Sequence, residues 1–147
     1  MKTWKKVALI LLIPVLAITA VWCGMALAAP ELPAALAPAV ARAEKQKRKL
    51  VLLLTGSTWC IDCQRLEKNA FATPAWQAFI KDEILLETYD YPEDRSAPTP
   101  VHEALRQLPG FRGYPTLVIA SPAGKLLALR DGSSISAAEL IAWIRSL

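Results

Sequence analysis

Residues 50–64 read LVLLLTGSTWCIDCQ, and this stretch decides how the chain folds. It begins with an unbroken apolar run, residues 50–54, which predicts a buried strand. Cys60 and Cys63 follow, and they open a segment in which apolar residues recur at helical spacing. The start of a helix carries a partial positive charge and unpaired N–H groups, and both stabilise a thiolate. A second thiol one turn further on can resolve a mixed disulfide, so the spacing predicts dithiol–disulfide chemistry.

The first 28 residues have the composition of an export segment. Three lysines lie within the first six residues, and no residue from 7 to 29 is charged. The sequence Ala26-Leu27-Ala28 suits cleavage of a signal peptide after Ala28. An uncharged run of about 20 residues is equally long enough for a retained membrane anchor. Both interpretations leave the basic end in the cytoplasm, so we expect the domain on the periplasmic side of the cytoplasmic membrane.

The cysteines favour reactivity over structural bridging. Loss of the leader would remove Cys23 and leave Cys60 and Cys63 as a pair. Lipidation of Cys23 is disfavoured, because Trp22 stands where a small residue is needed. A bridge over so short a loop restricts the unfolded chain little. A structural zinc site needs four ligands, and His102, which we expect to be a solvated helix residue, is the one further nitrogen or sulfur ligand after the leader.

The charge distribution argues against a nucleic-acid partner. The formal net charge is +4, but it depends on the leader lysines and on a basic cluster at 42–49. From residue 50 onward, acidic residues outnumber basic residues by two. The expected domain therefore has no overall basic surface for nucleic acid.

The rest of the chain alternates between strand and helix patterns. Residues 29–44, rich in alanine and proline, predict an exposed linker, and the folded domain is expected over 45–147. The expected strands are 50–54, 84–89, 117–120 and 126–129, and the expected helices are 60–70, 73–80, 101–108 and a last one capped by Ser136. This order predicts an α/β fold with a mixed sheet of about four strands and helices on both faces. Residues 89–91 are interpreted as the end of a strand and nothing more.

Two motifs resemble the thioredoxin superfamily. They are Trp59-Cys60-Ile61-Asp62-Cys63 after a buried strand and Gly113-Tyr114-Pro115-Thr116 before another strand. The resemblance extends over about residues 45–147. Within the superfamily the chain is most similar to small exported or membrane-tethered thioredoxin-like proteins and to the C-terminal periplasmic domain of the transmembrane thiol-reductant transporter.

This resemblance implies roles for particular residues. Cys60 would be the exposed attacking thiol and Cys63 the buried resolving thiol. Pro115 would follow a cis peptide bond, with Tyr114 presenting its backbone to an extended substrate segment. Trp59 would pack beside the site and contact the substrate.

The chain departs from thioredoxins proper at two places. Thioredoxins carry a buried acid six residues before the attacking cysteine, where this chain has Leu54. They also carry Gly-Pro between the cysteines, where this chain has Ile61-Asp62. The Asp62 carboxylate should oppose thiolate formation by like-charge repulsion, although it favours the start of a helix. We therefore predict that Asp62 tunes the site.

Residues and resemblance together predict a thiol–disulfide oxidoreductase of the cell envelope. A protein-disulfide reductase is preferred over an oxidase, because an oxidising exported compartment needs dedicated reductants. No cofactor and no resident metal are expected. The expected partners are proteins with disulfides or dithiols and a redox partner protein that recharges the site. Two alternatives remain open: a dithiol module that binds soft Cu(I), and a non-catalytic binding domain with the same fold.

Overall fold

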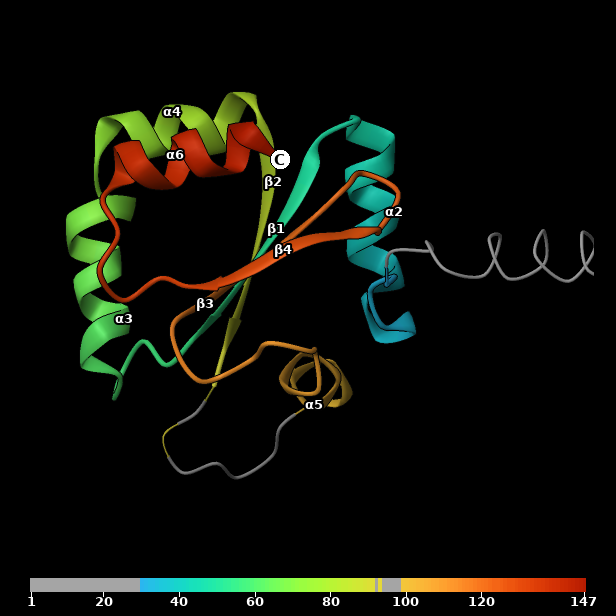
Figure 1. The fold of residues 1–147 in the computed structure, drawn as a ribbon, viewed down its shortest axis with the longest axis horizontal. Coiled ribbons are helices and arrows are strands. Elements are labelled where there is room, and N and C mark those ends of the chain that lie inside the picture. Colours follow the sequence, from blue (N-terminus) through green and yellow to red (C-terminus); the bar gives the residue numbers. More distant parts are fainter. Residues whose placement is uncertain (1–29, 92, 94–98) are drawn as a thin grey trace, which may run out of the picture.

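The computed structural model describes residues 30–91, 93 and 99–147. A four-stranded mixed sheet with the order β2-β1-β3-β4 forms the middle layer, and helices cover both of its faces (Figure 1). The strands are β1 (Lys49–Thr55), β2 (Ile84–Asp90), β3 (Thr116–Ala120) and β4 (Leu126–Asp131). The expected α/β fold is confirmed, and β4 extends two residues beyond its expected end.

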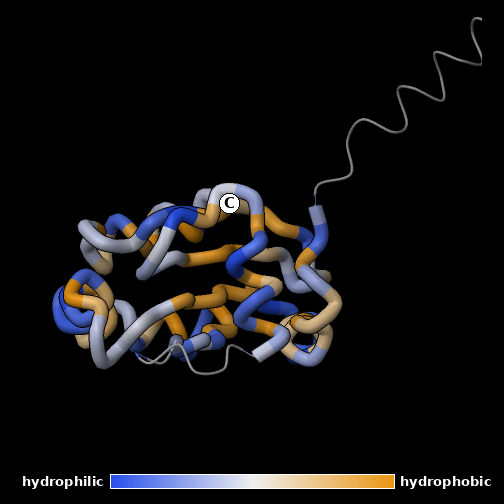
Figure 2. Tube along the Cα trace, turned by 90° about the horizontal axis from the view of Figure 1, so that it is seen from below, coloured by the Kyte–Doolittle hydropathy of each residue, from blue (hydrophilic) through white to orange (hydrophobic). Residues whose placement is uncertain are grey.

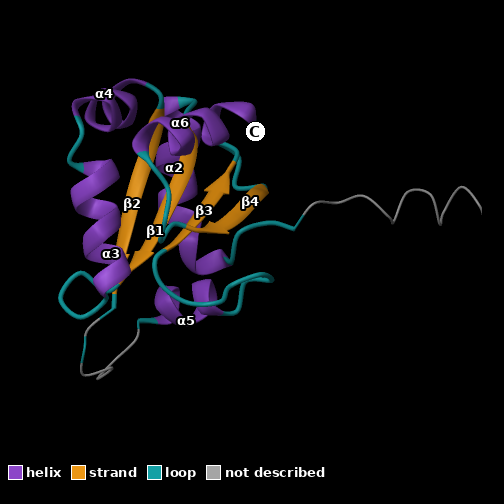
Figure 3. Cartoon of the chain, turned by 60° about the vertical axis from the view of Figure 1, so that its left-hand side comes forward, coloured by secondary structure: helices purple, strands orange, loops and turns teal. Residues whose placement is uncertain are grey.

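The helices form two groups, one on each face of the sheet (Figure 3). One face is covered by α3 (Ile61–Leu66), its π-helical continuation η2 (Glu67–Phe71), α4 (Pro74–Asp82) and α6 (Ala137–Ser146). The other face is covered by the 3-10 turn η1 (Ala34–Leu36), α2 (Ala37–Gln46) and α5 (Pro100–Arg106). The helix expected over residues 60–70 thus starts one residue later and ends in a π-helical turn.

Strand β1 lies between two separate apolar cores. Its side chains alternate, so that Val51 and Leu53 join the core under α4 and α6 while Leu50, Leu52 and Leu54 join the core under α2 and α5. Because helices cover both faces, residues 50–54 of the strand are all apolar rather than alternating with polar residues. Figure 2 shows the hydrophobic segments concentrated in the interior of the fold.

Two of the predicted helix starts are confirmed by their caps. Thr73 accepts a hydrogen bond from the backbone N–H of Trp76 at 3.3 Å, and Pro74 occupies the first turn of α4. Ser136 and Glu139 form a capping box at the start of α6. These local signals fix where the two helices begin and hence which of their faces meet the sheet.

The exposed linker predicted over residues 29–44 is contradicted from residue 34 onward. This part forms η1 and α2, and it buries Leu36, Ala39 and Ala43 against the sheet. Alanine is the strongest helix former and is small enough for close packing. Pro38 lies in the first turn of α2, where a missing N–H costs little. Composition alone suggested a spacer, but the alanines pack as a core face.

The predicted signal peptide or anchor over residues 1–28 lies outside the described residues. Within the part of the chain that the structure describes, no helix has the length and apolar character needed to cross a bilayer.

The register of the strands brings distant residues to one edge of the sheet. β1 runs parallel to β2, with Thr55 opposite Asp90, and antiparallel to β3, with Leu54 opposite Thr116. The end of β1, the end of β2 and the start of β3 therefore meet at the same edge. The segments that follow β1 and precede β3 contain both sequence motifs.

Candidate active site

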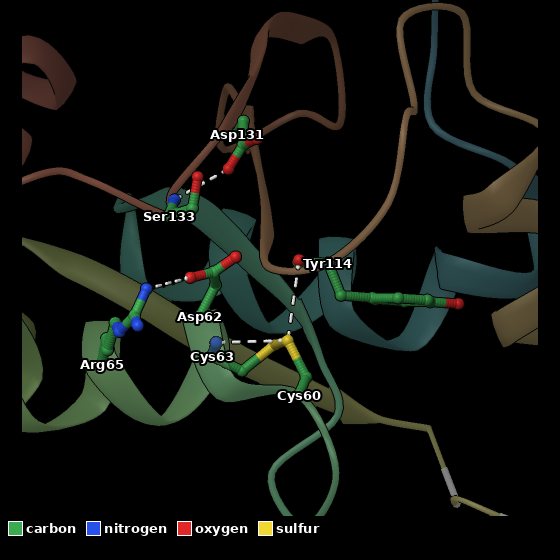
Figure 4. Close-up of polar contacts among 7 residues, drawn as sticks. All are labelled: Cys60, Asp62, Cys63, Arg65, Tyr114, Asp131 and Ser133. Carbon is green, nitrogen blue, oxygen red and sulfur yellow. Dashed lines mark hydrogen bonds and ion pairs between the residues drawn. A yellow bond between two sulfur atoms is a disulfide. The ribbon is translucent and has the colours of Figure 1, made fainter.

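The two cysteines form a disulfide at the start of α3 (Figure 4). Cys60 is the N-cap of the helix, with φ −93° and ψ 107°, and its Sγ accepts a hydrogen bond from the backbone N–H of Cys63 at 3.2 Å. Cys63 lies inside the helix, is fully buried, and its Sγ accepts from the Gly56 N–H at 3.4 Å. Cys60, which is expected to be exposed, is also buried, but its exposure of 8% makes it slightly more accessible than Cys63.

This placement favours a thiolate on Cys60 once the disulfide is reduced. The N–H groups of the first helical turn point toward the N-cap position, and one of them already reaches the Cys60 sulfur. The helix dipole adds a partial positive charge at the same place. A hydrogen bond to the charged form of a group stabilises that form. The geometry is therefore suited to nucleophilic attack by Cys60 and resolution by Cys63.

The Tyr114–Pro115 loop lies directly beside the dithiol. Its peptide bond is cis, as the resemblance implied. The Tyr114 carbonyl oxygen lies 3.6 Å from the Cys60 Sγ, although 54 residues separate them in sequence. Pro115 is buried, and its carbonyl oxygen accepts from the Gly132 N–H at 3.0 Å, which joins the loop after β4 to the site. The structure thus brings both motifs together, while the predicted substrate-binding roles of Tyr114 and Pro115 remain predictions.

Trp59 packs between the cysteine loop and the Pro115 loop. Its ring meets the Tyr114 ring edge-on, with centroids 5.6 Å apart, and its Nε1–H donates to the Tyr91 carbonyl oxygen at 2.8 Å. A Cβ added at Gly56 would overlap the Trp59 ring. The absence of a side chain at Gly56 therefore makes room for the tryptophan.

Asp62 points away from the sulfurs and toward Arg65 (Figure 4). The two side chains form an ion pair at 2.9 Å one turn apart, and both are about half exposed. Solvent screening and the guanidinium both weaken the field of this carboxylate at Cys60. The tuning role predicted for Asp62 is thus expected to be small.

No described carboxylate is buried near the dithiol. Leu54, at the position of the buried acid of thioredoxins, is fully buried in the core under α5. Among the described residues, the buried polar side chains are those of Thr55 and Thr116. Proton transfer to and from Cys63 therefore has no buried acid to assist it within the described part of the chain.

Asp90 and Tyr91, which the sequence pattern predicts to be only the end of a strand, belong to the site. Asp90 accepts hydrogen bonds from the Ser57 N–H at 2.9 Å and from the Ser57 hydroxyl, and so fixes the loop that leads into Cys60. Tyr91 is buried and its ring lies 4.6 Å from that of Tyr114. The sequence holds a signal for this position. Asp90 and Tyr91 lie at the carboxyl end of a strand, and the carboxyl ends of neighbouring parallel strands meet at one edge of a sheet.

His102 differs from the expected solvated residue. Its ring packs against Tyr91 with centroids 4.3 Å apart, and its Nδ1 accepts from the Thr99 N–H at 3.2 Å in a capping box of α5. Burial lowers the pKa of His102 below its usual value, although Asp90 and Glu103 act in the opposite direction. Across residues 30–91, 93 and 99–147, no three His, Cys, Asp or Glu side chains are grouped to hold a metal ion.

Comparison with known structures supports the fold. An oxidoreductase named DsbH shares 22% identity over 81% of this chain and 85% of its own, with a TM-score of 0.64. The C-terminal domain of DsbD from Neisseria meningitidis, in its oxidised form, shares 26% identity over 77% of this chain and 93% of its own, with a TM-score of 0.58. A disulphide isomerase from Xylella fastidiosa shares 18% identity over 76% and 86%, with a TM-score of 0.58. No curated protein matches the sequence significantly.

The family itself follows from the sequence match. The family described as thioredoxin-like domain matches residues 36–147, which begin at the last residue of η1 and include both motifs, the sheet and the helices on its two faces. With its Cys60–Cys63 pair at the start of α3, the chain belongs to the thioredoxin-like domain family.

Proposed function

We propose that this protein is a thiol–disulfide oxidoreductase that exchanges disulfides with other proteins through Cys60 and Cys63. One observation carries the proposal: the two sulfurs are unequal. Cys60 sits at the N-cap of α3 and keeps 8% exposure, whereas Cys63 lies inside the helix and is fully buried. A structural bridge needs no such difference, but a two-step exchange does.

In the reducing direction, the chemistry runs in two steps. The Cys60 thiolate attacks one sulfur of a substrate disulfide, that S–S bond breaks, and the departing substrate thiolate takes up a proton. Cys63 then loses its proton and attacks the Cys60 sulfur, which releases the second substrate thiolate and forms the Cys60–Cys63 disulfide. Two electrons pass to the substrate, and a partner dithiol must return them. Oxidation of a substrate dithiol is the reverse of these steps.

We propose that substrates approach along Tyr114. Its carbonyl oxygen lies beside the Cys60 sulfur, so a peptide segment held next to this backbone would place its own sulfur close to the nucleophile. Trp59 packs against the Tyr114 ring and would complete one wall of the contact.

We further propose that the protein works as a reductase in the cell envelope. The basic start and uncharged run of the leader support export. An exported compartment that is kept oxidising needs proteins that supply reductant. The DsbD C-terminal domain of Neisseria meningitidis, which resembles this chain, has been solved in oxidised and reduced forms.

The point where the chain enters the domain suits a membrane tether. The Pro30 carbonyl oxygen accepts from the Leu126 N–H, next to the turn between β3 and β4. This turn follows Ala120, which lies opposite Leu50 near the start of β1, whereas Cys60 follows the end of β1. The seven residues of β1 span roughly 20 Å. A tether before Pro30 would therefore leave the dithiol at the end of the domain that faces away from the membrane.

Two experiments test the exchange itself. Redox titration of the protein against glutathione should show one two-electron transition of the Cys60–Cys63 pair. The Cys63→Ala variant should trap a mixed disulfide with substrate, and the Cys60→Ala variant should trap none. Absence of a mixed disulfide on Cys63→Ala would select the non-catalytic binding domain, and tight stoichiometric Cu(I) binding without exchange would select the metal module.

The envelope location is tested separately. A fusion of residues 1–45 to alkaline phosphatase should be active, because that enzyme matures only outside the cytoplasm. An inactive fusion would reject both the signal-peptide and the anchor interpretation, and would leave the exchange chemistry untouched.

A further inference from the structure

Tyr91 contacts three separate segments of the site. Its backbone N–H donates to the Thr55 carbonyl oxygen at 2.8 Å, and its own carbonyl oxygen accepts from Trp59 Nε1 at 2.8 Å. Its hydroxyl donates to the His102 carbonyl oxygen on α5 at 2.7 Å. Its ring packs on the ring of Tyr114 with centroids 4.6 Å apart. One residue thus joins the cysteine loop, α5 and the Pro115 loop.

The segments that Tyr91 joins are those that flank the reactive sulfur. Trp59 directly precedes Cys60, and the Tyr114 carbonyl oxygen lies 3.6 Å from the Cys60 Sγ. The rings of Trp59 and Tyr114 also meet edge-on, so Tyr91, Trp59 and Tyr114 form a closed set of three mutual contacts. A shift of one member must move the others.

We propose that Tyr91 is a positioning residue that holds the Tyr114 backbone at the distance from Cys60 at which a substrate segment is accepted. This inference rests on the proposed disulfide exchange and adds to it a residue that touches neither sulfur nor substrate. Its action passes through Tyr114, whose ring also contacts Trp59 and Phe111 and whose loop is bonded to Gly132 through the Pro115 carbonyl oxygen.

The backbone, the ring and the hydroxyl of Tyr91 contribute differently to the position of Tyr114. The carbonyl bond to Trp59 is made by the backbone and survives any substitution that keeps the fold. The ring fills the space against Tyr114, whereas the hydroxyl fixes the ring to α5 and also interacts with the Tyr114 side chain. Burial raises the pKa of Tyr91, so the hydroxyl stays protonated and remains a donor. Positioning of Tyr114 should therefore suffer most in a variant that loses both the ring and the hydroxyl, and less in one that loses the hydroxyl alone.

The experiment compares a protein substrate with a small disulfide. Reduction of insulin requires a polypeptide to lie along Tyr114, whereas reduction of 2-hydroxyethyl disulfide requires only access to the Cys60 sulfur. Both are measured with dithiothreitol as the electron source, for the wild type, Tyr91→Leu, Tyr91→Phe and Tyr89→Leu. Tyr89 is the matched control, since it is also a tyrosine of the β2 end and also packs on His102, at 6.1 Å.

We expect the loss of Tyr91 to change the KM for insulin but not the rate with the small disulfide. Tyr91→Leu should raise the KM for insulin about tenfold, while its rate with 2-hydroxyethyl disulfide stays within about twofold of the wild type. Tyr91→Phe keeps the ring and should restore the KM for insulin to within about threefold, and Tyr89→Leu should leave both reactions unchanged.

Two results overturn the inference. One is a Tyr91→Leu variant with the wild-type KM for insulin, and the other is a variant that slows both substrates equally, as a loosened fold would. Each result removes the positioning role alone. If the wild type reduces neither substrate, the proposed function fails, and this inference fails with it. The two failures are therefore distinguishable.

Discussion

The Asp90 carboxylate accepts hydrogen bonds from both the backbone N–H and the hydroxyl of Ser57. Asp90 is the last residue of β2, and Ser57 lies in the turn between β1 and α3. Gln64 reaches the same turn from α3, because its side-chain amide donates to the Ser57 carbonyl oxygen at 3.1 Å. The loop that delivers Cys60 is thus fixed from the neighbouring strand and from its own helix.

Asp90→Ala should therefore lower the free energy of unfolding by about 1 kcal/mol, because two hydrogen bonds to a charged but exposed acceptor are lost. Asp90→Asn keeps one acceptor and should cost less. Urea unfolding of the three proteins checks this order. Equal stability of Asp90→Ala and the wild type would mean that Gln64 alone is enough to hold the turn.

Gly56→Ala should cost about 2 kcal/mol, because the new methyl group would overlap the Trp59 ring and force it away. The same change should cost much less when Trp59→Leu has already removed the ring. Urea unfolding of the two single variants and the double variant gives the coupling. If the two costs simply add, the contact between residue 56 and the ring is not what makes alanine unfavourable.

The strands and the dithiol could be predicted because their signals are local. Residues 50–54 form an apolar run that suits a strand buried on both sides, and Cys60 and Cys63 are one helical turn apart. The cap at Thr73 and the proline after it are equally local. By contrast, the proximity of Tyr114 to Cys60 depends on how β1 and β3 pair, and only the family resemblance suggested it.

The expectations that differ from the structure concern residues whose environment is decided by tertiary packing. The composition of residues 29–44 is compatible with an exposed spacer and with a helix that packs through small side chains, and only contact with the sheet decides between them. The sequence does not mark Asp90 and Tyr91 as site residues because each acts on a distant segment, Asp90 on Ser57 and Tyr91 on Tyr114. The sequence predicts a solvated His102 because its aromatic neighbours, on β2 and just after it, are distant in the chain.

Stability should fall as the pH drops below the usual pKa of histidine, about 6.5. The pKa of His102 is lowered in the folded protein, chiefly by burial, so the folded state binds this proton less readily than the unfolded state. Its contribution to stability is therefore present above the unfolded pKa and is lost as the pH falls through the folded pKa. Protonation also removes the Nδ1 acceptor of the Thr99 N–H.

Urea unfolding at pH 7.5 and pH 5 measures this loss, and His102→Gln is the comparison because glutamine does not titrate. We expect the wild type to lose more stability than His102→Gln between the two pH values. Carboxylates such as Glu83 and Glu139, whose pKa values are lowered by hydrogen bonds, contribute equally to both proteins. An identical loss in the two proteins would show that His102 is not the responsible group.

In the reduced protein, Cys60 should react with iodoacetamide before Cys63, because Cys63 is fully buried and Cys60 sits at the N-cap of α3. Asp62→Asn should speed this alkylation roughly twofold at pH 7 by removing a negative charge that is exposed and paired. Arg65→Gln should slow it, because the Asp62 carboxylate would then lose its partner. Mass spectrometry of samples quenched at short times gives the order and the rates. Labelling of Cys63 first would reverse the assigned roles of the two thiols, and equal rates in the wild type and both variants would remove the tuning role of Asp62.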